Sequence, residues 1–217
     1  MLKFSVGIPP GSPLRILCLG AHCDDVEIGA GAAVMHLLES HPGSSVCWVV
    51  CASDPQRRIE AEASARAFCA AADHLSTTIG ALPENLLPQH TIEVRDLLVG
   101  FARPFAPDLV FAPRRDDLHQ DHRLLGEMAL QLFRDHPILE YEIVKYDGDL
   151  KTPNLYLAID DALAQRKVDL IFEQFPSQHS RTWFDREAFL GLMRLRGIEC
   201  NERYAEGFHV RKVVVGQ

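Results

Sequence analysis

The stretch that most constrains this chain is a short apolar segment followed at once by a cluster of ionisable side chains. Residues 14–19 are mostly apolar, which is typical of a buried parallel strand. His22, Asp24 and Asp25 come next, and small residues between 29 and 33 would let a following helix start close against a sheet. Ligands bind at the carboxyl ends of the strands in open α/β sheets. The sequence therefore predicts a site where this strand ends.

The His–Asp cluster has the donor types of a metal site. A catalytic zinc usually takes three protein ligands and leaves one position for water, and it accepts both imidazole nitrogen and carboxylate oxygen. His22 and Asp25 supply two such ligands. Two adjacent aspartates cannot point the same way from a regular backbone. We therefore expect Asp24 and Asp25 to do different jobs, one holding a metal while the other faces substrate.

A third ligand has to come from elsewhere, and the segment 118–123 offers it. His119 and His122 are three residues apart, so on a helical turn they would share a face. Each motif also has a simpler interpretation, because an Asp–Asp pair after a strand can be a helix N-cap and an isolated His-x-x-His is often only a polar helix face. The occurrence of both motifs, each just beyond an apolar strand-like run, favours a site.

These motifs resemble those of the PIG-L/LmbE-like zinc-dependent N-deacetylases. The resemblance is carried by residues 21–31, which read Ala-His-x-Asp-Asp-x-Glu-x-Gly-x-Gly, and by His119-x-Asp121-His122. It runs from about Arg15 to residues 204–208. Three positions in the motifs depart from the family pattern without removing a donor atom: Cys23, Ala32 and Gln120.

The resemblance implies a role for each residue of the two motifs. The implied zinc ligands are His22, Asp25 and His122. Asp24 would be the general base for the metal-activated water, His119 would stabilise or protonate the tetrahedral intermediate, and Asp121 would orient His119. Iron(II) or another divalent ion could replace zinc, because sites built from histidine and carboxylate are not exclusive.

The resemblance also implies the substrate class, an N-acetylated amino sugar of the N-acetylglucosamine type that is nucleotide-, lipid- or glycoside-linked. Acetate would be released. Five residues are expected at the substrate end of the pocket, where arginine could also pair with a phosphate: Arg57, Arg58, Arg114, Arg115 and Asp117. Two alternatives stay open: an amidase acting on a non-sugar or thiol-conjugate amide, and a family member that binds metal without turnover.

Two other classes of protein fit the motifs less well. A receiver-like signalling domain carries an acidic pair after its first strand, but it has no use for His22 or for the second pair of histidines. A dinucleotide-binding module needs Gly-x-Gly-x-x-Gly directly after the strand. Gly20 is followed by Ala-His, so that spacing fails.

The rest of the chain alternates strand-like and helix-like segments. Strands are expected at 45–51, 108–113, 138–144, 154–159 and, as a closing edge strand, 208–215; helices are expected at 57–72, 92–101, 123–134, 160–173 and 185–195. Such alternation is typical of an α/β fold. We therefore expect a single-domain, Rossmann-like three-layer sandwich with a mainly parallel sheet over residues 1–217, with residues 1–13 as an N-terminal extension.

Composition bounds the remaining possibilities. A chain of 217 residues with 47% hydrophobic residues can build one sizeable core. A net charge of −8 argues against a nucleic-acid-binding surface. No apolar stretch approaches the length of a membrane span, and six cysteines without a Cys-x-x-Cys pair favour reduced thiols. We expect a cytoplasmic protein acting on a small molecule, and a homo-oligomer is possible.

Overall fold

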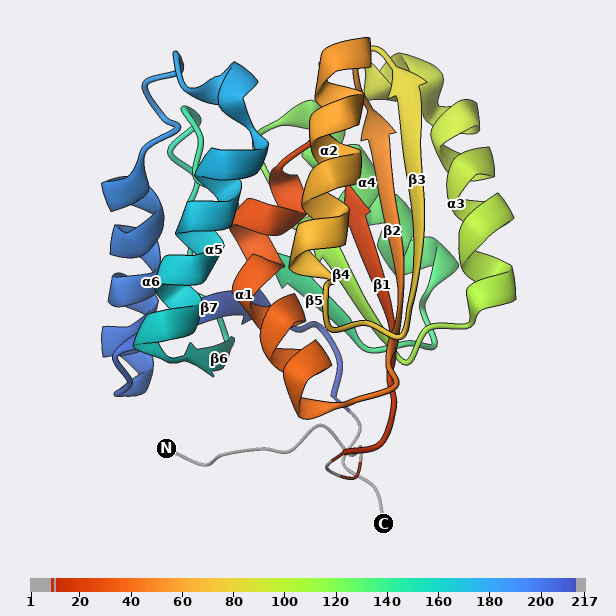
Figure 1. Cartoon of the computed structure of the whole chain (residues 1–217). Helices are drawn as coiled ribbons and strands as arrows, with labels where there is room; N and C mark the ends of the chain where they lie inside the picture. Colours follow the sequence, from red (N-terminus) through yellow and green to blue (C-terminus); the bar gives the residue numbers. More distant parts are fainter. Residues whose placement is uncertain (1–8, 10, 214–217) are drawn as a thin grey trace.

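In the computed structural model, one seven-stranded sheet lies between two layers of helices (Figure 1). The structure describes residue 9 and residues 11–213, without the side chains of 101–104, so most of the expected N-terminal extension lies outside the described residues. The elements in chain order are β1 (Arg15–Gly20), α1 (Asp25–Ser40), β2 (Ser45–Ala52), α2 (Pro55–Phe68), β3 (His74–Leu82), the short helix η1 (Leu87–His90), α3 (Thr91–Phe105), β4 (Leu109–Pro113), α4 (Gln120–Leu132), β5 (Ile138–Tyr141), β6 (Leu155–Ile159), α5 (Asp161–Gln174), η2 (Pro176–Gln178), α6 (Arg186–Cys200) and β7 (Tyr204–His209).

The strand order explains where a ligand can bind. The order is β3-β2-β1-β4-β5-β7-β6, and the five strands from β3 to β5 pair in parallel, whereas β7 is antiparallel to both of its neighbours. The chain runs outward from β1 to β2 and β3, and then returns to place β4 on the other side of β1. The direction of winding therefore reverses between β1 and β4, and open α/β sheets bind ligands at such a switch point.

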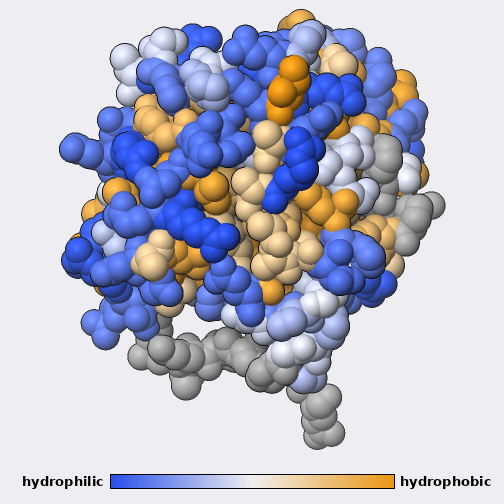
Figure 2. All heavy atoms as spheres, in the orientation of Figure 1, coloured by the Kyte–Doolittle hydropathy of each residue, from blue (hydrophilic) through white to orange (hydrophobic). Residues whose placement is uncertain are grey.

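Each face of the sheet has its own apolar core. Successive side chains of a strand point to opposite faces, so Ile16 and Cys18 of β1 join the core under α1, α2, α5 and α6, while Leu17 and Leu19 join the core under α3 and α4. Figure 2 shows the first of these faces from outside, with hydrophilic side chains over most of it. The prediction of a three-layer, mainly parallel α/β fold is confirmed.

Two glycines let α1 lie close to its neighbours. A Cβ atom at Gly29 would come 2.2 Å from Tyr141 Cδ2, and one at Gly31 would come 2.5 Å from Phe68 Cε1. Neither position has room for a side chain. The Tyr141 hydroxyl also donates a 2.6 Å hydrogen bond to the carbonyl of Leu19, so β5 supports the end of β1 where the site begins.

Two features of the sheet differ from the sequence-based expectations. Strand β3 was not predicted, because its exposed and half-buried residues give no clear apolar run. The prediction of a closing edge strand at 208–215 was wrong: β7 ends at His209 and lies between β5 and β6. The cause is the central segment of β7, from Ala205 to Phe208, which is buried under the helices. Among the described helices, none is long and apolar enough to cross a membrane.

Candidate active site

The carboxyl ends of β1 and β4 bring the two predicted motifs together. These strands are parallel neighbours, with Ile16 opposite Leu109 and Cys18 opposite Phe111. His22 follows β1, and His122 lies in the first turn of α4, which follows β4 after a short loop. Their rings approach to 3.1 Å between His22 Nδ1 and His122 Nε2, although the two residues are 100 positions apart in the chain.

Asp25 completes a set of three donors. Its carboxylate lies 3.6 Å from His22 Nδ1 and 3.2 Å from His122 Nε2. Zinc binds nitrogen and oxygen at about 2.0–2.2 Å, so the ligands of a tetrahedral ion are separated by about 3.3–3.6 Å. The three separations, 3.1, 3.2 and 3.6 Å, lie within or slightly below that range, with each histidine nearest a different oxygen of Asp25. The residues present therefore fit a metal ion of this kind, with one side of the set left for a further ligand.

The electrostatics of this group favour a cation. Burial would raise the pKa of Asp25, but the adjacent His122 and His22 hold it well below its usual value. Burial would lower the pKa of His22, yet Asp25 and Asp121 raise it to about 10. The carboxylates thus outweigh desolvation, and the potential that stabilises a proton on His22 would also stabilise a divalent cation.

His22 and His122 each have a second carboxylate behind the ring. Asp121 Oδ2 lies 2.9 Å from His22 Nε2, and the backbone N–H groups of Asn85 and Leu87 donate to the same carboxylate. Asp117 Oδ2 lies 3.4 Å from His122 Nδ1. Carboxylates in this position orient metal-binding imidazoles and fix their tautomers.

These contacts change two expectations. The Asp121 carboxylate, which the resemblance implied would orient His119, contacts His22 and the loop before η1, while the backbone N–H of Asp121 donates to His119 Nδ1. Because β1 and β4 are paired, the start of α4 lies next to the end of β1, and the Asp121 carboxylate reaches His22. Asp117 was expected at the substrate end of the pocket, but it is buried, and it contacts Lys145 Nζ at 3.1 Å as well as His122.

Asp24 occupies a strained position between the strand and the helix. Its φ is 126°, a value that side-chain-bearing residues rarely adopt, and such strain concentrates at functional sites. Asp24 is the N-cap residue of α1, yet its side chain makes no capping hydrogen bond, so the simpler N-cap interpretation does not describe it. Burial raises the pKa of Asp24 to about 7, although Arg57 opposes this shift.

Arg57 is the one of the four predicted arginines that contacts Asp24. Its Nη2 lies 2.9 Å from Asp24 Oδ2 and donates to the carbonyl of Cys23. Arg58, one residue later on α2, pairs with Glu62 on the surface. Arg114 is buried and pairs with Asp116 and Asp149. Arg115 is exposed and lines a surface hollow together with Glu127, Leu130 and Gln131 of α4. These placements give Arg58, Arg114 and Arg115 no contact with the motif residues.

His119 is placed differently from the expectation of a shared helix face. It is the N-cap residue of α4, so it lies outside the helix that carries His122. Its ring nevertheless stacks on that of His122, with centroids 4.5 Å apart. Burial, together with the charges of His122 and His22, lowers the pKa of His119. A neutral imidazole is therefore expected at this position near pH 7.

Three residues of the site escaped the sequence reasoning: Glu84, Asn85 and Lys145. Glu84 Oε1 lies 3.9 Å from Arg57 Nη1, and Asn85 contacts both His119 and Asp121. Glu84 and Asn85 follow β3, and Lys145 follows β5. If β3 had been recognised as a strand, Glu84 and Asn85 would have been expected at the carboxyl end of the sheet, beside the motifs.

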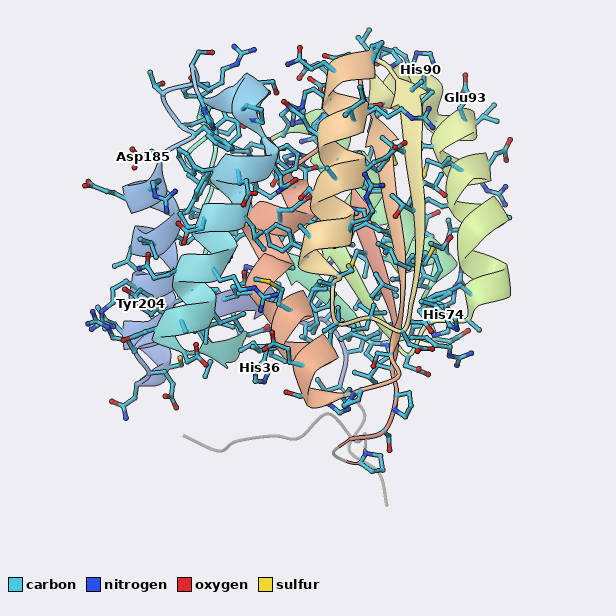
Figure 3. The ribbon with its side chains drawn as sticks, viewed as in Figure 1. His36, His74, His90, Glu93, Asp185 and Tyr204 are labelled. Carbon is cyan, nitrogen blue, oxygen red and sulfur yellow. The ribbon has the colours of Figure 1, made fainter. Side chains whose placement is uncertain are left out.

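The other histidines do not join this cluster. Among the described residues, His22, His119 and His122 form the one histidine group that could hold a metal, with a ligand atom of each within 4.8 Å of the others. Figure 3 shows His36 and His74 at the opposite end of the sheet, and His90 beside Glu93 on the α3 side. The site is thus confined to the end of the sheet where the parallel strands have their carboxyl ends.

The chain belongs to the PIG-L family, because the profile of that family, described as GlcNAc-PI de-N-acetylase, matches residues 17–133, more than half of the chain. Among curated proteins, 112 residues are 23% identical to the DNA replication and repair protein RecF of Lactococcus lactis subsp. cremoris (strain MG1363), covering 50% of this chain and 31% of RecF. The chain thus spans less than a third of the length of the curated relatives it matches.

Three solved structures share the fold over nearly the whole chain. The conserved protein TT1542 from Thermus thermophilus has a TM-score of 0.73 and 20% identity, covering 94% of this chain and 97% of that one. N,N'-diacetylchitobiose deacetylase from Pyrococcus horikoshii has a TM-score of 0.71 and 24% identity, covering 91% and 83%. GalB, the 4-carboxy-2-hydroxymuconate hydratase of Pseudomonas putida KT2440, has a TM-score of 0.70 and 17% identity, covering 94% and 98%.

Proposed function

We propose that this protein is a metal-dependent hydrolase that removes an N-acetyl group from an acetylated amino sugar of the N-acetylglucosamine type. Acetate and a free amine would be the products. The observation that carries the proposal is the set of three donors from His22, Asp25 and His122, with Asp24 beside it at the switch point of the sheet. Membership of the PIG-L family supports it. The fold alone would not, because it is shared by a deacetylase and a hydratase.

The donor set suits more than one metal ion. His22, Asp25 and His122 would hold zinc, and iron(II) suits the same nitrogen and oxygen donors. When bound, such an ion lowers the pKa of a coordinated water to about 7 and polarises the amide carbonyl. The buried carboxylates Asp121 and Asp117 would keep both imidazoles turned to it.

The proton transfers are assigned to Asp24. Its carboxylate is buried beside the donor set and would take the proton of the attacking water, then return it to the leaving nitrogen. Arg57 would hold that carboxylate in place through its contacts with Asp24 and the Cys23 carbonyl. His119, neutral and close to both ligand histidines, would donate a hydrogen bond to the oxyanion or assist the leaving amine.

The pocket is suited to a polar substrate. Six buried polar side-chain atoms of the described residues make no hydrogen bond, and four of them are at this site: Asp24 Oδ2, Arg57 Nε, Glu84 Oε1 and His122 Nδ1. Three of the four, Asp24 Oδ2, Glu84 Oε1 and His122 Nδ1, have an ion-pair neighbour instead. Buried polar groups are normally paired. Sugar hydroxyls could pair with the carboxylates and the guanidinium. If the sugar carries a phosphate, Arg57 is the one predicted arginine that lies beside the donor set and could pair with it.

The test is acetate release from free, nucleotide-linked and glycoside-linked N-acetylglucosamine by metal-stripped protein, before and after zinc is restored. We expect release that depends on zinc and differs among the three sugars. No release from any N-acetyl sugar, with release from thiol-conjugate amides instead, would transfer the proposal to an amidase. Tight zinc binding without turnover of either class would identify a metal-binding member that is not an enzyme.

A further inference from the structure

His119 lies close enough to the donor set to become a metal ligand itself. A ring nitrogen of each of His22, His119 and His122 lies within 4.8 Å of the others, and the rings of His22 and His119 meet edge to face at 4.8 Å. Three imidazoles and the Asp25 carboxylate would make four protein ligands. Zinc sites with four protein ligands are structural, whereas catalytic sites leave one position for water or substrate. The site therefore needs something that holds His119 back.

Both ring nitrogens of His119 already have partners. Nε2 lies 3.0 Å from Asn85 Oδ1, which can only accept a hydrogen bond. Nδ1 accepts from the backbone N–H of Asp121 at 3.3 Å. This arrangement requires the neutral tautomer with its proton on Nε2. A nitrogen that carries a proton cannot bind a metal, and the other nitrogen is turned to the start of α4.

Asn85 is itself rigidly placed. Its φ of 64° lies in the left-handed region, which asparagine tolerates better than most residues. Its N–H donates to Asp121 Oδ2 at 2.7 Å, and its carbonyl accepts from the Gln120 side chain. The backbone contacts therefore tie the loop after β3 to the start of α4, and the side chain adds the contact with His119.

We propose that Asn85 is a positioning residue that keeps His119 out of the metal's coordination shell and so preserves an open position for water. This inference rests on the metal-binding part of the proposed function. It assigns Asn85 no contact with the reacting atoms. To become a fourth ligand, His119 would have to give up its hydrogen bond to Asn85 or its contact with the Asp121 N–H, and the side-chain oxygen of Asn85 therefore holds it outside the coordination shell.

The test counts imidazole ligands by X-ray absorption at the zinc edge and measures zinc affinity by competition with a chelator. In the wild-type protein, we expect about two imidazoles per zinc. Asn85→Gly allows the same backbone conformation without the side-chain oxygen, so the count should rise to about three and zinc should bind on the order of tenfold more tightly. Asn85→Asp keeps an acceptor and should stay at two.

Two further variants make the result decisive. The double variant Asn85→Gly/His119→Ala should return to two imidazoles, and His119→Ala alone should keep the wild-type count and affinity. Three imidazoles in the wild type, a loss of one imidazole in His119→Ala, or an unchanged count in a folded Asn85→Gly would each overturn the inference while leaving the proposed activity open. A wild type that binds no stoichiometric zinc would overturn both.

Discussion

Two groups of buried charges lie along α1, and they differ in how completely they are paired. At the start of the helix, the site around Asp24 leaves four buried polar atoms without hydrogen bonds. Midway along it, Glu206 of β7 accepts from the N–H groups of Ala32 and Ala33 at 3.0 and 2.7 Å. Lys167 of α5 contacts the same carboxylate at 2.5 Å and donates to the Ile28 carbonyl at 2.6 Å.

The difference teaches how to separate function from stability in this fold. A buried network joins α1, α5 and β7, and every charged side-chain atom in it makes at least one hydrogen bond. The site, by contrast, combines strain at Asp24 with buried polar atoms that lie beside charged neighbours without forming a hydrogen bond. This comparison also gives a structural explanation for Glu206, which lies within residues 204–208, where the family resemblance ends. Variants at the first group should change metal binding and turnover, and variants at the second should change stability.

The largest effect is expected at the proposed metal ligands. His122→Ala removes one of three donors, so the protein should lose bound zinc and, with it, measurable acetate release. Zinc content by mass spectrometry of the purified protein provides the measurement. His74→Ala is the control, because that histidine is exposed at the other end of the sheet. Full zinc occupancy in His122→Ala would remove it from the ligand set.

The next effect separates the two adjacent aspartates. Asp24→Asn preserves shape but cannot accept a proton, so zinc should be retained and turnover should fall by about 10²–10⁴. Asp25→Asn should weaken zinc binding first. Parallel measurement of zinc affinity and turnover distinguishes the two. If Asp24→Asn loses zinc and Asp25→Asn keeps it, the two roles must be exchanged.

The paired group should respond in stability alone. Lys167→Met leaves the Glu206 carboxylate buried without its counter-charge, which should lower the free energy of unfolding by about 3–5 kcal/mol. Chemical denaturation measures this change. The neighbouring Arg166→Met is the matched control, because its pair with Glu39 is on the surface and such pairs contribute about 0–1 kcal/mol. Equal losses in the two variants would contradict the distinction between buried and exposed pairs.

The smallest effect is expected at Arg115, in the loop between β4 and α4. Arg115→Ala should change neither zinc affinity nor turnover and should alter stability by no more than about 0.5 kcal/mol, because the exposed side chain has no contact with the motif residues. Steady-state kinetics on neutral and nucleotide-linked sugars provide the check. A selective loss of activity on the nucleotide-linked sugar would restore the phosphate-binding role first expected for it.

The sequence predicted the parts that depend on local pattern. An apolar run before His22 and another before His119 were enough to expect two parallel strands with polar residues at their carboxyl ends. The pairing of β1 with β4 then joins His22, Asp25 and His122 as expected from the family resemblance. Patterns of this kind can be read from the sequence because burial and chain direction dictate them.

The parts that failed depend on tertiary contacts. Strand β3 lies at the sheet edge, where His74 and other polar residues hide the alternation that marks a strand. The family resemblance implied that Asp121 orients its neighbour His119, whereas the fold places its carboxylate against His22. Asn85 belongs to no recognisable sequence motif. Its importance comes from a loop that meets α4 in space.

The most direct test of the central claim is the position of the metal. Crystals of the protein grown with zinc, measured at the zinc absorption edge, should show one strong anomalous peak bounded by His22 Nδ1, His122 Nε2 and the Asp25 carboxylate. The Lys167–Glu206 group should show none, because its donors are already paired. An absent peak at the three donors, or a peak only at another place in the molecule, would contradict the account.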